Sequence, residues 1–132
     1  ICVFPGVRAA IGALQRRFAE NPPPGFAGAV LEGRDIGTVI CPAAPVKIFI
    51  TANAEIRAQR RHKELQSRGI PSTYDAVLAD LRQRDARDSG RETAPLKPAP
   101  DAVILDTSDL GADQALSAAL DIVRRKAPHL LP

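Results

Sequence analysis

The stretch Val46-Lys47-Ile48-Phe49-Ile50-Thr51 decides the fold class of this chain. Its β-branched and aromatic residues favour a β-strand. Two further apolar runs, Ala29-Val30-Leu31 and Ala102-Val103-Ile104-Leu105-Asp106, are expected to be buried strands of the same kind. Continuous apolar strands that alternate with helices indicate an α/β fold with a parallel sheet covered on both faces.

An amphipathic helix is expected before the first strand. Apolar residues recur at helical spacing at Val7, Ile11, Leu14 and Phe18, which predicts a helix over about 6–20. The prolines at 22–24 end it, because proline lacks the amide hydrogen of the helical bond and restricts the residue before it.

Three more helices follow from capping signals and periodicity. Thr51 or Asn53 can cap the second helix, which is expected to stop at Gly69. Ser72-Thr73-Tyr74-Asp75 resembles a capping box before the third helix. The expected ranges of these three helices are about 54–68, 73–88 and 112–126.

Composition places the chain among globular proteins of one domain. It has 132 residues, of which 45% are apolar and 25% charged. No apolar run approaches the roughly 20 residues that cross a bilayer, and no signal-peptide pattern opens the chain. Met is absent, so we expect the sequence to be the C-terminal part of a longer protein.

Cysteine and histidine are too scarce for a metal or disulfide framework. Cys2 and Cys41 lie far apart in the sequence, and His62 and His129 are the two histidines. Four-cysteine zinc sites are excluded by count. Two reduced thiols are typical of a cytoplasmic protein.

Positive charge is concentrated in one quarter of the chain. Residues 57–91 hold nine basic and five acidic side chains, a net charge of +4 against +3 for the whole chain. Eight of the nine basic residues are arginine, whose planar fork binds phosphate bidentately. The pattern indicates a phosphate ligand, and a solvated helical face is the alternative.

The motif Gly33-Arg34-Asp35-Ile36-Gly37 directly follows the expected strand at 29–31. Ligands of parallel α/β sheets bind at the carboxyl ends of the strands. Glycine allows close backbone approach, arginine offers a phosphate fork, and aspartate can accept from an amino group or a ribose hydroxyl. A turn with a local ion pair remains the alternative.

Arg84, Asp88 and Arg91 share one helix face if the helix continues that far. Such a face could clamp a phosphate, although a local Arg84–Asp88 ion pair would explain two of the three residues. The charged helix–Gly–helix segment before it could be a mobile lid, or simply an exposed hairpin. Its first half carries Arg57, Arg60 and Arg61.

Several stretches together resemble the bacterial cytidylate kinases, over nearly the whole chain and in the family's order. They are Phe4-Pro5-Gly6-Val7-Arg8, 33–39, 45–49, 84–91, Ala94-Pro95-Leu96 and 105–108. The resemblance implies a three-layer parallel five-stranded sheet of the nucleoside monophosphate kinase (P-loop NTPase) type, incomplete here. Residues 1–132 would form one partial domain, with the substrate-binding helix in about 1–28 and the lid in about 54–91.

The resemblance implies a transferase of pyrimidine nucleotide metabolism, in which ATP as co-substrate and Mg²⁺ serve phosphoryl transfer to CMP or dCMP. Arg8 and Asp35 would face the cytosine, and Arg34 would lie near the substrate phosphate. The residues expected to bind substrate are Arg8, Arg34, Asp35, Arg84, Asp88 and Arg91. Those expected on the ATP side of the lid are Arg57, Arg60 and Arg61. Those expected to be catalytic are Arg84, Arg91 and Arg60.

Two departures from the family pattern concern ATP and the metal. No glycine is followed by lysine, so the family's phosphate-binding loop is missing, and with it the central strand that feeds this loop. Glu32 stands where the family more often has Asp, and it is expected to hold Mg²⁺ through water. We therefore expect the 132 residues alone to be inactive.

Two other functions stay open. One is a non-catalytic nucleotide-binding or interaction module of the same fold. The other is a basic nucleic-acid-binding domain, which one Tyr, four Phe and no Trp argue against. The preferred interpretation is a cytoplasmic, monomeric kinase whose partners are nucleotides, with no nucleic acid or membrane partner.

Overall fold

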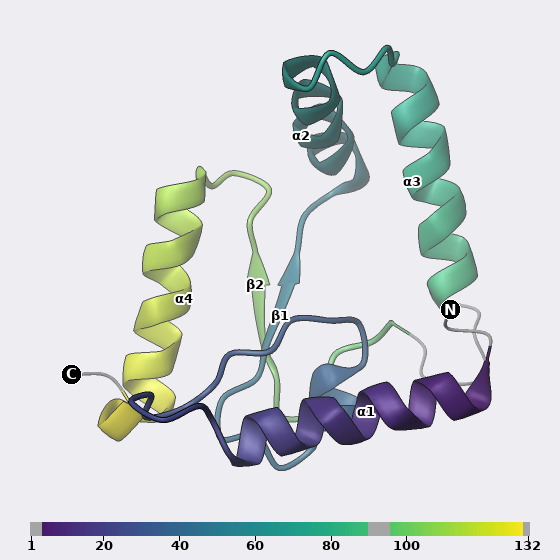
Figure 1. Ribbon diagram of the computed structural model, residues 1–132. Helices are drawn as coiled ribbons and strands as arrows, with labels where there is room; N and C mark the ends of the chain where they lie inside the picture. Colours follow the sequence, from purple (N-terminus) through teal and green to yellow (C-terminus); the bar gives the residue numbers. More distant parts are fainter. Residues whose placement is uncertain (1–3, 90–95, 131–132) are drawn as a thin grey trace.

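The computed structural model describes residues 4–89 and 96–130. Their sheet has two parallel strands, β1 (Ile48–Thr51) and β2 (Val103–Asp106), in the register Ile48↔Val103 through Thr51↔Asp106. The helix α4 (Ala112–Lys126) follows β2 and lies beside it, and the short turn η2 (Pro128–Leu130) follows α4 (Figure 1). The α/β class and two of the three expected strands are confirmed.

Two consecutive helices form a hairpin beyond the carboxyl end of β1 (Figure 1). They are α2 (Ala54–Ser67) and α3 (Tyr74–Ser89). The Oδ1 atom of Asn53 accepts a hydrogen bond from the Ile56 amide at 2.8 Å, so Asn53 is the N-cap of α2. Gly69, at a φ of +67°, takes the left-handed conformation after α2. The expected boundaries of both helices are confirmed to within one residue.

The first helix, α1 (Pro5–Glu20), contacts the short π-helical turn η1 (Ile36–Ile40). Gly12 is buried there, and a Cβ atom on it would lie 3.4 Å from the Ile40 Cδ1 atom. Arg16 donates from Nε to the Ile40 carbonyl at 3.1 Å. The helix forms as expected and is fastened to η1 by a close approach and a hydrogen bond.

The expected strand at 29–31 is wrong, because these residues pair with no strand among the described residues. A strand is defined by hydrogen bonds to a neighbouring strand, and its own sequence cannot supply them. Val30, at the centre of this run, is 98% exposed.

Coverage of the sheet also differs from the expectation. Residues at the same register position share a face, so Ile104 lies on the face of Phe49, and Ile50 on that of Leu105. Ile50 is 63% and Ile104 is 61% exposed, so each face keeps an exposed isoleucine. Within 4–89 and 96–130 the two faces are therefore not covered as predicted.

No helix among the described residues combines the length and the apolarity that crossing a bilayer requires.

Candidate functional site

The Gly33–Gly37 loop brings together four of the six residues predicted to bind substrate. Asp35 accepts a hydrogen bond from Arg8 of α1, with 2.6 Å between Oδ2 and Nη2. Arg34 forms an ion pair with Asp88 in the last turn of α3. Arg34 and Asp35 thus bind partners far away in sequence, and the alternative of a turn with a local ion pair is wrong.

Asp88 is the least exposed of these four residues. Its side chain is only 4% exposed, and its Oδ2 atom faces the Nη1 atom of Arg34. A buried carboxylate needs a cation or hydrogen-bond donors, since removing it from water is costly. The Arg34–Asp88 pair therefore attaches the last turn of α3 to the loop.

The two glycines of the loop contribute in different ways. A Cβ atom on Gly33 would lie 2.8 Å from the Cγ1 atom of Ile36, so this position is filled by the loop's own side chain. A Cβ atom on Gly37 would lie 3.4 Å from the Lys47 side chain, an ordinary contact. Close packing within the loop thus accounts for Gly33.

Arg84 is not joined to the cluster. Its side chain is 54% exposed and pairs with Asp80 one turn earlier on α3, with 2.8 Å between Nη2 and Oδ2. The local Arg84–Asp88 pair considered from the sequence is therefore wrong. Arg91, the third member of that expected face, lies outside the described residues.

The three arginines of α2 have three different environments. Arg57 binds Asp85 of α3 through both Nη atoms, at 2.9 and 2.5 Å, and donates from Nε to the Ala52 carbonyl at 3.0 Å. Arg61 is exposed and pairs with Glu64 on its own helix. The predicted ATP-side residues therefore do not form one cluster.

Arg60 binds the loop between β2 and α4. Its guanidinium donates to the Thr107 hydroxyl at 3.1 Å, to the Thr107 carbonyl at 2.5 Å and to the Leu110 carbonyl at 3.0 Å. The buried Thr107 in turn donates from its amide and its hydroxyl to the Thr51 carbonyl, at 2.8 and 3.0 Å. Arg60 thus helps to hold together the carboxyl ends of both strands.

Ion pairing and hydrogen bonding lower the pKa values of two carboxyl groups near this end of the sheet. The hydrogen-bonded Arg57 guanidinium holds the pKa of Asp85 below its ordinary value, and the charge of Arg34 lowers it further. The Ser108 hydroxyl and amide lower the pKa of Asp106. Both groups are therefore carboxylates at neutral pH.

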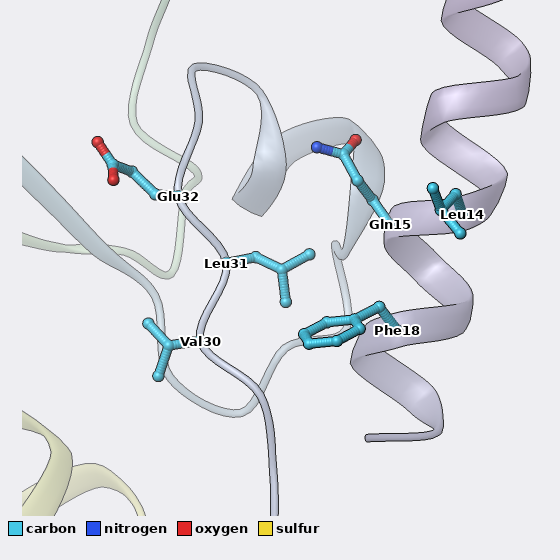
Figure 2. Close-up of a pocket in the computed structure, with 6 residues that line it drawn as sticks. All are labelled: Leu14, Gln15, Phe18, Val30, Leu31 and Glu32. Carbon is cyan, nitrogen blue, oxygen red and sulfur yellow. The ribbon is translucent and has the colours of Figure 1, made fainter. Parts of the chain in front are cut away.

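Glu32, the predicted magnesium ligand, is exposed at the rim of an open pocket of about 400 Å³ between α1 and residues 30–32 (Figure 2). Its carboxylate points away from the apolar side chains of Leu31 and Phe18 (Figure 2). Across 4–89 and 96–130, no three Asp, Glu, His or Cys side chains gather as a metal cluster. The pocket is lined by Leu14, Gln15, Phe18, Val30, Leu31 and Glu32.

The sequence places Thr107 in the polar stretch 106–108 at the carboxyl end of an expected strand, where a site is expected, but does not indicate its contacts. Asp85 lies in the motif 84–91, which does not indicate a role for it. One feature of the sequence could have pointed to Asp85 as the partner of an arginine: it is an acid among arginines and lies off the Arg84–Asp88 face. Asp85 lies 28 residues from its partner Arg57, and Thr107 lies 47 residues from Arg60. The sequence does not indicate such distant pairs.

Comparison with known proteins gives one consistent result. A family model described as cytidylate kinase matches residues 1–125. A cytidylate kinase of Paramagnetospirillum magneticum is 60% identical over 126 residues, 96% of this chain and 59% of its own length. One of Rhodospirillum rubrum is 61% identical over 124 residues, 94% of this chain and 58% of its own length. This chain thus spans somewhat under three fifths of these relatives.

Proposed function

This chain belongs to the cytidylate kinase family, and from that membership we propose that the protein carrying it transfers the terminal phosphoryl group of ATP to CMP or dCMP. The products would be ADP and CDP or dCDP. The fold we propose for the whole protein is the five-stranded P-loop NTPase sheet of the nucleoside monophosphate kinases, of which β1 and β2 are two neighbouring strands.

The observation that carries the proposal is the Arg8–Asp35 pair. It places a guanidinium donor beside a carboxylate acceptor, both half-buried. Cytosine presents an acceptor at N3 beside a 4-amino donor, which this pair matches. Uracil presents the opposite order, a donor at N3 beside a carbonyl, and would leave both groups of the protein mismatched.

The phosphate of CMP would be bound next to this pair. Arg34 is the chain neighbour of Asp35, and its guanidinium pairs with Asp88 at the end of α3. We propose that Arg84 and Arg91 join it and act as catalytic residues on the transferring phosphoryl group, whose charge they would neutralise. Asp88 would orient Arg34 and accept from a pentose hydroxyl. The exposed Arg84 is free to swing from Asp80 toward a ligand.

ATP would bind on the α2 side of this site. Arg60 and Arg61 are proposed to face it, with Arg60 also in a catalytic role. The 132 residues hold no Gly-Lys pair of the type that cradles ATP phosphates, so the proposal concerns the whole protein. For Mg²⁺, Glu32 is the proposed ligand, through water. Magnesium is commonly held by one or two carboxylates together with substrate phosphates, which fits this isolated side chain.

The proposal includes a cytoplasmic, monomeric protein whose partners are the nucleotides. A non-catalytic nucleotide-binding protein of the same fold is the second candidate. The arrangement around Arg34 and Asp35 supports binding in both cases. The two candidates differ in turnover, since only the kinase forms CDP from CMP and ATP.

Titration of the full-length protein with CMP and with UMP tests the proposal. We expect CMP to bind at least about fivefold more tightly, because mismatched, partly buried polar groups cost about 1–3 kcal/mol. The Asp35→Asn variant should lose most of this preference, since its amide can donate to the uracil carbonyl. Equal affinities in the wild type would contradict the proposed base site.

A matched control is Asp101→Asn, which removes a carboxylate paired with Lys47 at the opposite end of the strands. It should leave the CMP preference unchanged. An assay of ADP and CDP on the same samples separates the kinase from a non-catalytic binding protein.

A further inference from the structure

Arg57 connects three parts of the chain through one side chain. It lies in the first turn of α2 and donates from Nε to the carbonyl of Ala52, directly after β1. Its two Nη atoms bind the two carboxylate oxygens of Asp85 on α3. Bidentate pairs of this kind fix orientation as well as distance. The end of β1 is therefore tied to one defined point on α3.

Asp85 lies on α3 next to two residues of the proposed substrate site. It follows Arg84 directly and precedes Asp88 by three residues, so these side chains belong to the same helical turn. Asp88 is attached to Arg34 of the loop. The end of α3 is thus fixed at two points, Asp85 by Arg57 and Asp88 by Arg34.

The guanidinium of Arg57 is committed to these contacts. All three of its nitrogen atoms donate to protein acceptors. Arg61, four residues later, instead makes one ion pair within its own helix and is exposed. Because its charge is balanced by Asp85 and all three nitrogen atoms are engaged, Arg57 is suited to hold other groups in place and less suited to bind a phosphate. Arg60 differs, since its hydrogen bonds among the described residues go to neutral oxygen atoms.

We propose that Arg57 and Asp85 form a positioning pair that sets the last turn of α3, and with it Arg84 and Asp88, at the phosphoryl-transfer site without touching a nucleotide. This inference rests on the proposed kinase function. It changes the expected role of Arg57 from an ATP-side contact to a residue that acts through Asp85. Errors of about 1 Å in the placement of catalytic groups can cost about a hundredfold in rate, so a change in this pair should be visible in turnover.

A kinetic double-mutant cycle in the protein at its full encoded length tests the pair. The variants are Arg57→Lys, Asp85→Asn and the double variant, with rates normalised to the folded fraction. We expect each single change to lower kcat about tenfold. The kcat of the double variant should lie within about twofold of the kcat of the less active single variant, because both changes break the same interaction. The KM for ATP should stay within about twofold, and Asp85→Glu should recover part of the rate.

The chain offers a matched control in a second ion pair between the same helices. Arg82 and Glu55 also join α3 to α2, at 2.7 Å, but both are exposed. Glu55→Gln and Arg82→Gln should each leave kcat within about twofold of the wild type.

Several results would overturn the inference. Losses that multiply to about a hundredfold in the double variant would mean that the residues act separately. A tenfold higher KM for ATP in Arg57→Lys would make Arg57 a nucleotide contact. Unchanged rates per folded molecule in both single variants would make the pair purely structural. A wild type that forms no CDP would instead overturn the kinase function itself, and the inference with it.

Discussion

The α2–α3 hairpin and helix α1 are held in place by different forces. Polar contacts hold the hairpin against its surroundings: Arg57 binds the Ala52 carbonyl, Arg60 binds the loop after β2, and Asp88 binds Arg34. Helix α1 has one close approach to η1 and two polar contacts, and its apolar stripe is exposed to solvent. The members of this stripe are Val7, Ile11, Leu14 and Phe18.

This contrast shows which kinds of side chain find their partners within the described residues. Directional polar contacts find their partners inside the 132 residues. The apolar stripe of α1 and the run at 29–31 share an open pocket in which Val30 and the stripe stay exposed, although apolar burial is the main source of folding free energy. Exposed apolar surface of this extent marks an interface or a tendency to aggregate.

The largest expected effect concerns the 132-residue chain expressed by itself. We expect it to self-associate and to melt without a sharp cooperative transition, because its large apolar side chains are poorly buried. Sedimentation velocity and calorimetry measure both properties. A monomer of 14.1 kDa with a sharp melt would show that the exposed apolar side chains do not limit the stability of this chain.

Two variants of α1 identify the surface responsible. Leu14→Lys with Phe18→Lys places charge on the apolar stripe and should shift the chain toward the monomer. Ala9→Lys with Ala13→Lys adds the same charge away from the stripe, on exposed positions, and should not.

A smaller effect is expected at the start of the hairpin. Asn53→Ala removes the acceptor for the Ile56 amide and should lower the free energy of unfolding of the whole protein by about 1 kcal/mol. Urea denaturation measures the change. Asn53→Ser keeps a capping oxygen and should recover most of the loss, and an equal loss in both variants would show that the cap contributes little.

The smallest effect is the pH dependence of the Arg57–Asp85 pair. Because the pKa of Asp85 is lowered in the folded state, its contribution to stability is complete above its ordinary value of 3.8 and is lost as the pH falls below it. Both side chains are about one third exposed, so the contribution is at most about 1 kcal/mol.

Urea denaturation at pH 7 and pH 3 should therefore show a smaller decline in Asp85→Asn than in the wild type. Salt at about 1 M should reduce the difference, since it screens exposed charges. Identical declines in the two proteins would show that the pair does not link stability to pH.

Local signals predicted the helices well. The caps at Asn53 and Gly69 and the prolines after α1 act within a few residues, and the sequence states them directly. The strand at 29–31 could not be predicted in the same way, since its formation depends on a neighbour and not on its own apolar residues.

The site was predictable in its members but not in its contacts. Arg34 and Asp35 follow from the motif, and the structure joins them to the expected Asp88 and Arg8. The link from Arg57 to Asp85 was not predicted. Long flexible arginine side chains reach acceptors on other elements, and which acceptor they reach is decided by tertiary packing.

The two ion pairs of the 33–37 loop have a mechanical consequence. Arg8 lies on α1 and Asp88 on α3, and their partners are the adjacent residues Arg34 and Asp35. A load applied between the two helices through these pairs passes across a single peptide unit. That unit is planar and stiff, so it stretches little. A displacement of α1 would therefore be passed on to the end of α3 through this short connection.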